Sequence, residues 1–90
     1  MQQKVIDMAI RRGFKVYVDV TVMFIEGEMF PKSLIWEDGT RYEFDKVEKI
    51  GRRANKRAGG CGICYLCRAN GKNMHLYYEE NNRWFVESKK

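Results

Sequence analysis

The sequence predicts a mostly β protein: a small antiparallel barrel of five or six strands, Src-homology-3-like or oligonucleotide-binding-like, with one short N-terminal helix. Two observations predict this fold. Apolar and polar residues alternate in short runs that are separated by turn signals. The 90 residues correspond to a single domain, and antiparallel strands in so short a chain protect their edges most economically by curling into a barrel. An open sheet covered by the helix is the alternative.

Residues 2–12 are predicted to form the helix, because their apolar side chains recur at helical spacing and Gly13 follows as a C-terminal cap. A helix of about 11 residues is marginal in isolation, so it is expected to pack on the barrel, with a partner-binding arm as the alternative. We therefore divide the chain into an N-terminal helix, residues 1–13, and one β-barrel domain, residues 14–88.

The first strand is predicted at Phe14–Ile25, where apolar and polar side chains alternate without interruption. Its even-numbered residues from Phe14 to Phe24 share one face, and the polar side chains of Lys15, Asp19 and Thr21 lie on the other. Twelve residues exceed the usual strand length. We therefore expect the strand to bend and to serve two parts of a curled sheet.

The middle of the chain is predicted to contain two more strands. Pro31 restricts the next strand to an edge or a first position, so we place it at Ser33–Trp36. Asp38-Gly39 is a two-residue hairpin signal, and the returning strand runs from Arg41 to about Ile50. The alternation in this strand changes phase near Asp45, which indicates a bulge or a sharp bend.

The last part of the chain, Cys61 to Glu87, is predicted to be a meander of three strands. Asn70-Gly71 is a strong hairpin signal and Asn81-Asn82 a weaker one. Residues 51–60 contain no large apolar side chain, so we interpret them as a loop between the two halves of the domain.

Three cysteines, Cys61, Cys64 and Cys67, recur at every third position, and His75 follows. In a loop, these four side chains could converge on one zinc ion. In a strand, Cys64 faces away from the other two, and the outer pair lies about 20 Å apart. We therefore interpret the cysteines as structural, with the metal site as the first alternative and a redox thiol pair as the second, and we expect no cofactor.

A basic segment spans residues 46–57, within a chain of net charge +5. Flexible cations can bind the phosphates of nucleic acid, and exposed aromatic rings can stack on its bases. The candidate stacking residues are Tyr17, Tyr65, Tyr77 and Trp36. Acidic side chains close by favour the competing interpretation of a solvated, solubilising loop. The candidate nucleic-acid-binding residues are Lys46, Lys49, Arg52, Arg53, Lys56 and Arg57.

Catalysis is not expected, because the chain contains no nucleophile elbow, phosphate-binding loop or dinucleotide fingerprint. No apolar run approaches the roughly 20 residues of a membrane-spanning helix, and no secretory signal begins the sequence. Cysteines without an export signal indicate reduced thiols. The sequence therefore predicts a cytoplasmic protein that does not associate with membranes.

Three short patterns occur along the chain: Trp36-Glu37-Asp38-Gly39 with Tyr42 and Asp45-Lys46-Val47, then Gly59-Gly60 with Gly62 and Tyr65, and Trp84-Phe85-Val86-Glu87. With these patterns the chain resembles small uncharacterised proteins of Gram-positive bacteria or their phages. The resemblance covers roughly residues 14–88 and implies a compact, mostly β domain of bacterial or phage origin. It implies no activity and no site residues.

Three functions remain open. The first is a non-enzymatic binding module for nucleic acid that uses the basic segment. The second is a protein-interaction or self-associating domain that uses an exposed strand edge or the helix. The third is a small cysteine-ligated metal domain.

Overall fold

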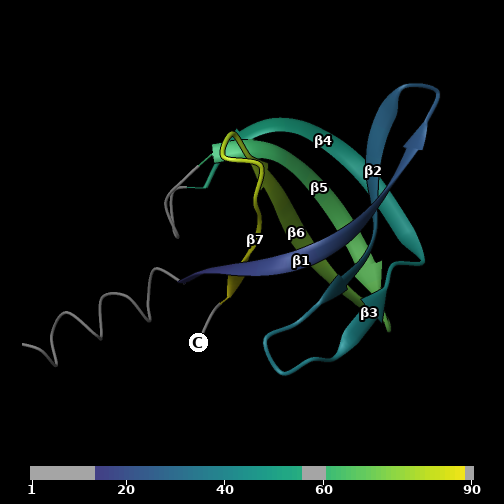
Figure 1. Cartoon of the computed structure of the whole chain (residues 1–90), viewed down its shortest axis with the longest axis vertical. Coiled ribbons are helices and arrows are strands. Elements are labelled where there is room, and N and C mark those ends of the chain that lie inside the picture. The colour runs from purple at the N-terminus through teal and green to yellow at the C-terminus, as the bar shows by residue number, and fades with distance from the viewer. Residues whose placement is uncertain (1–13, 56–60, 89–90) are drawn as a thin grey trace, which may run out of the picture.

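The computed structural model describes residues 14–55 and 61–88, and these form a single antiparallel sheet that curls into a half-barrel (Figure 1). The predicted mostly β, antiparallel fold is confirmed. The helix predicted at residues 2–12 lies outside the described residues. The strands are β1 Phe14–Ile25, β2 Glu28–Ile35, β3 Arg41–Glu43, β4 Lys46–Ala54, β5 Cys61–Ala69, β6 Lys72–Glu79 and β7 Trp84–Ser88.

The sheet has seven strands in the order β3-β2-β1-β7-β6-β5-β4, so the predicted number of five or six is wrong. The single strand expected from Arg41 to Ile50 is two strands that pair with different neighbours: β3 with β2, and β4 with β5. The chain turns between them at Phe44 and Asp45, where the alternation changed phase. Strand β4 also continues through Gly51 to Ala54, into the segment predicted to be a loop.

The predicted bounds and dual role of β1 are confirmed. Its first part, Phe14 to Val18, pairs with β7, and its second part, Asp19 to Ile25, pairs with β2. A register shift between Thr21 and Val22 bends the strand. In Figure 1 the end of β1 and the start of β2 project from the body as a hairpin.

Strand β2 begins at Glu28, five residues earlier than predicted, and includes Pro31 opposite Val22. Proline removes a backbone donor, so it is tolerated where a strand lacks a partner on one side. Strand β3 pairs only with the Ser33–Ile35 part of β2. Pro31 therefore occupies an edge-like part of β2, next to the irregularity in β1.

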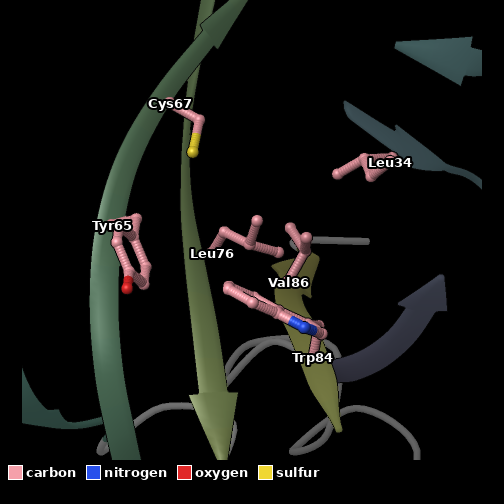
Figure 2. Close-up of a cluster of buried hydrophobic side chains, with 6 residues drawn as sticks. All are labelled: Leu34, Tyr65, Cys67, Leu76, Trp84 and Val86. Carbon is pink, nitrogen blue, oxygen red and sulfur yellow. The ribbon is translucent and has the colours of Figure 1, made fainter. Parts of the chain in front are cut away.

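The main core fills the inner face of the half-barrel. Because the strands are in antiparallel register, Val86 lies beside Leu76, and Leu76 beside Tyr65. Figure 2 shows these side chains converging with those of the neighbouring strands. The Tyr65 hydroxyl also donates a hydrogen bond of 2.7 Å to the Met29 carbonyl oxygen, which connects β5 to β2 across the core. The buried cluster comprises Leu34, Tyr65, Cys67, Leu76, Trp84 and Val86.

A second, smaller core lies on the outer face of the same sheet. Register places Tyr17, Phe85, Tyr77 and Cys64 in one row across four strands. The Phe85 ring stacks on Tyr77 with centroids 4.8 Å apart, and it meets Tyr17 edge-on at 6.2 Å. The amino group of Lys15 lies 5.0 Å from the Phe85 ring centre, and Phe85 is 0% exposed. The sheet is thus stabilised by burial on both faces.

Beside the outer core, Glu79 anchors the β6–β7 turn to β1. It accepts hydrogen bonds from the Lys15 amino group at 2.8 Å, the Tyr17 hydroxyl at 2.7 Å and the Asn81 amide at 3.3 Å. The hydrogen bond from Lys15 lowers the pKa of Glu79, and the same hydrogen bond raises the pKa of Lys15. The two shifts agree that the charged pair is favoured in the folded protein.

We expect Glu79→Gln to lower the free energy of unfolding at pH 7 by about 1–3 kcal/mol, because hydrogen bonds to a charged group are lost. Folding lowers the pKa of Glu79. The ionised Glu79 side chain therefore stabilises the folded protein fully at pH values above its ordinary pKa of 4.5, and this stabilisation is lost as the pH falls through the pKa of the folded state. Urea denaturation at pH 7 and pH 3 should therefore show the difference from wild type shrinking in acid.

The control variant is Glu80→Gln, which alters an adjacent, largely exposed carboxylate paired with Arg52 at 3.6 Å. An exposed ion pair contributes little, so this variant should match wild type at both pH values. Equal losses in the two variants would contradict the anchoring role of Glu79.

Candidate functional site

An apolar pocket of about 340 Å³ opens at the end of the half-barrel, where β3 meets the β5–β6 turn. It is at the low end of the range of about 300–1,000 Å³ that is usual for binding pockets. It is large enough for one large side chain of a partner. Its lining is aromatic and aliphatic with two polar residues: Leu34, Trp36, Tyr42, Ala69, Asn70, Lys72, Met74 and Val86.

Two tight turns build the rim of this pocket. In the turn between β2 and β3, the Trp36 amide donates to the Thr40 carbonyl at 2.8 Å and the Gly39 amide to the Trp36 carbonyl at 2.9 Å. Gly39 adopts a φ of 89°, which suits a residue without a β-carbon. The turn fixes Trp36 half-buried at the pocket wall.

The predicted hairpin at Asn70-Gly71 is confirmed, with φ values of 53° and 75°. Positive φ at both central residues is typical of the two-residue turn that matches strand twist. This hairpin contributes Asn70 and Lys72 to the lining of the pocket. Lys72 is exposed and, among the described residues, is the only charged residue in the lining, so the pocket favours an apolar group next to a negative charge.

Four of the six predicted nucleic-acid-binding residues lie on β4, which is an edge strand of the sheet. Register splits them between the two faces: Lys46 and Arg53 lie on the outer side, and Lys49 and Arg52 on the inner side. The Lys49 amino group is 3.8 Å from Glu28, and the Arg52 guanidinium 3.6 Å from Glu80. Lys56 and Arg57 lie outside the described residues.

Charged side chains on an edge strand prevent it from pairing with the edge of another sheet. The cations of β4 therefore have a structural role, the protection of an edge strand, which was not predicted from the sequence. The described residues contain ten lysines and arginines against eleven aspartates and glutamates, a net charge of −1, whereas the whole chain carries +5. The body of the half-barrel therefore presents no excess of positive charge to a polyanion.

The aromatic side chains proposed for base stacking are only partly accessible. Tyr65 and Tyr77 are buried in the inner and outer cores. Tyr17 is half-buried, and the Arg83 guanidinium lies 3.6 Å from the centre of its ring. Trp36 remains available, but at the pocket and not beside the basic strand.

The cysteines lie on β5, as the strand interpretation required. Cys67 is buried in the inner core and Cys64 in the outer core, on opposite faces of the sheet, while Cys61 is exposed. The alternative metal-ligand set of these cysteines with His75, which is exposed on β6, is not brought together. No group of three or more histidine, cysteine or acidic side chains suited to a metal ion occurs within residues 14–55 and 61–88.

We expect the three thiols to differ sharply in reactivity at pH 8. Burial raises the pKa of Cys67 to about 12 and also raises the pKa of Cys64. Because the thiolate is the reactive form, both should resist alkylation until the protein unfolds, and Cys61 should react first. Mass spectrometry after timed labelling in buffer and in denaturant measures this. Protection of all three thiols by added zinc would instead indicate the metal site.

Comparisons with protein-family models, with curated proteins and with solved structures found no match to this chain. Among the described residues, none forms a helix long and apolar enough to cross a membrane.

The pocket was not predicted from the sequence, although several of its residues lie next to predicted turns. Trp36 and Tyr42 flank the predicted Asp38-Gly39 turn, and Met74 follows the predicted Asn70-Gly71 turn. The sequence feature that could have indicated the site is the presence of large apolar side chains next to both hairpin turns. Strands β1 and β7 lie between β2 and β6 in the strand order, so it is the curl of the sheet that brings the two turns to one pocket (Figure 1).

Proposed function

We propose that this protein is a non-enzymatic binding module that holds an apolar side chain of a partner protein in the pocket beside Trp36, Tyr42 and Met74. The observation that carries the proposal is an accessible, mostly apolar pocket with two aromatic walls and one cation, Lys72. Aromatic residues in pockets of this kind dominate the energy of protein recognition. The expected ligand is a segment with a large apolar residue next to an acidic one.

The nucleic-acid module that the sequence placed first becomes the second candidate. The spread of Lys46, Lys49, Arg52 and Arg53 along an edge strand supports an edge-protecting role equally well. The narrower likeness to Src-homology-3-like or oligonucleotide-binding-like barrels stays a prediction, as do the cytoplasmic location and the bacterial or phage origin.

The test is selection of peptides from a random display library on the folded protein, followed by affinity measurements with the selected peptides. We expect Trp36→Ala to weaken binding by about 2 kcal/mol or more, as for a central aromatic anchor. Lys72→Glu should weaken the acidic peptides selectively. Arg53→Glu, an equal charge change on β4 away from the pocket, is the matched control and should bind like wild type.

Peptides that bind Trp36→Ala and wild type equally would contradict the proposal, provided that both proteins show the same unfolding transition. A parallel titration with short oligonucleotides at two salt concentrations tests the second candidate. Steeply salt-dependent binding that is lost when Lys49, Arg52 and Arg53 become alanine would favour nucleic acid.

A further inference from the structure

The second part of β1, Asp19–Ile25, has a strand on only one side among the described residues. It pairs with β2, whereas the pairing of β1 with β7 ends at Val18 opposite Trp84. The backbone groups on its other side thus form a seven-residue free edge. A hollow of about 360 Å³ lies where this free edge begins, lined by Tyr17, Val18, Asp19, Val20, Asn82, Arg83 and Trp84.

This free edge lacks the protection that the two outer edges of the sheet have. Strand β4 carries four cations, and β3 is only three residues long. The free edge of β1 has the sequence DVTVMFI, with a single charge at Asp19. An exposed, apolar strand edge is a template for pairing with another strand.

Apolar side chains at the end of this edge are exposed on both faces of the hairpin. Met23, Phe24 and Ile25 are 43%, 69% and 49% exposed. Successive side chains of a strand alternate between faces, so no single flat surface covers all three. A strand added alongside β1 supplies neighbours on both faces at once.

We propose that the free edge of β1 pairs with the same edge of a second copy, giving a two-fold dimer with a continuous sheet β2-β1-β1-β2. This inference concerns a different surface from the proposed binding pocket. Antiparallel pairing of one segment with itself is self-complementary, as a two-fold interface requires. Full overlap of Asp19–Ile25 centres the pairing on Val22 and sets Thr21 opposite Met23 of the second copy.

Charge and shape favour a second copy as the occupant. In this register, the second copy's turn at Glu26-Gly27 reaches the level of Val18, beside the hollow that contains Arg83. Arg83 lines this hollow, so its positive charge favours the approach of the Glu26 carboxylate. The acidic residues Glu26 and Glu28 at the hairpin end count against insertion into an anionic membrane surface.

Sedimentation equilibrium over a range of concentrations tests the dimer. Wild type should shift from monomer toward dimer as concentration rises. Phe24→Lys places a charge on the pairing edge and should weaken dimerisation by at least about tenfold. Ile35→Lys is the matched control, since Ile35 is also an exposed apolar residue, at 39%, but lies on β2, where it pairs with Asp19 on the side of β1 opposite the free edge.

The register is tested by cross-linking in a Cys61→Ala background, which removes the exposed thiol. A mixture of Thr21→Cys and Met23→Cys proteins should form a disulfide-linked heterodimer faster than either protein forms a homodimer. If the wild-type protein stays monomeric at all concentrations, the proposal is overturned. The free edge would then be available to pair only with a strand of another protein. Equal weakening by Phe24→Lys and Ile35→Lys would also overturn the proposal, and neither result bears on the pocket.

Discussion

Gly62→Ala is expected to lower the free energy of unfolding by about 3 kcal/mol, the upper end of the usual cost of overpacking. Gly62 lies on β5 opposite Glu79 of β6. A β-carbon at this position would meet the backbone of the paired strand: the carbonyl oxygen of Tyr78, its carbonyl carbon at 2.8 Å and the Cα of Glu79 at 3.1 Å. Backbone atoms cannot move aside as a flexible side chain can, so β5 and β6 must separate locally.

Chemical denaturation of Gly62→Ala and of Cys61→Ala provides the measurement. Cys61 is the preceding residue on the same strand but is exposed, so its replacement should change stability by less than about 0.5 kcal/mol. A Gly62→Ala protein as stable as Cys61→Ala would show that the two strands are not packed so closely at this position.

Phe85→Ala is expected to lower the free energy of unfolding by about 3–5 kcal/mol, the usual cost of removing a buried aromatic side chain. The loss includes the stacking on Tyr77, the edge contact with Tyr17 and the contact with the Lys15 amino group. Because Phe85 is on the outer face of the sheet, the result tests whether the outer cluster is a true second core.

Phe24→Ala is the matched control for this prediction, since it removes the same atoms from a side chain that is 69% exposed. Measured at a concentration where the protein is monomeric, it should change stability by less than about 0.5 kcal/mol. Similar effects of the two substitutions would contradict the second core.

Local patterns were sufficient to predict the strands whose signals lie in adjacent residues. The alternation from Phe14 to Ile25 predicted both ends of β1 and its bend. The Asn70-Gly71 turn predicted the β5–β6 hairpin, because positive φ at two successive residues restricts the sequence strongly.

The errors arose where tertiary pairing decides the outcome. Gly51 looked like the start of a loop, yet it lies within β4 beside a register shift, with a φ of 116°. A glycine at a bulge continues a strand that the sequence pattern interrupts. The cations after it were placed in a loop that either binds polyanions or is only solvated, whereas Arg52 and Arg53 belong to an edge strand.

The pocket could not be predicted from the sequence, because it too depends on tertiary arrangement. Trp36, Tyr42 and Met74 come from two hairpins more than 30 residues apart. They meet because β3 and the β5–β6 turn lie at the same end of the curled sheet. The spacing of the cysteines, in contrast, was correctly interpreted as a strand pattern, since alternation sends Cys64 and Cys67 to opposite faces.

The most direct test of the binding module is a nuclear magnetic resonance titration of the labelled protein with a selected peptide. The account predicts that the Trp36 indole and the Met74 methyl signals shift together and saturate, while the backbone amides of Lys49 to Arg53 on β4 stay unchanged. Shifts concentrated on β4, with the Trp36 and Met74 signals unchanged, would contradict binding at the pocket. They would instead favour β4 as the binding surface.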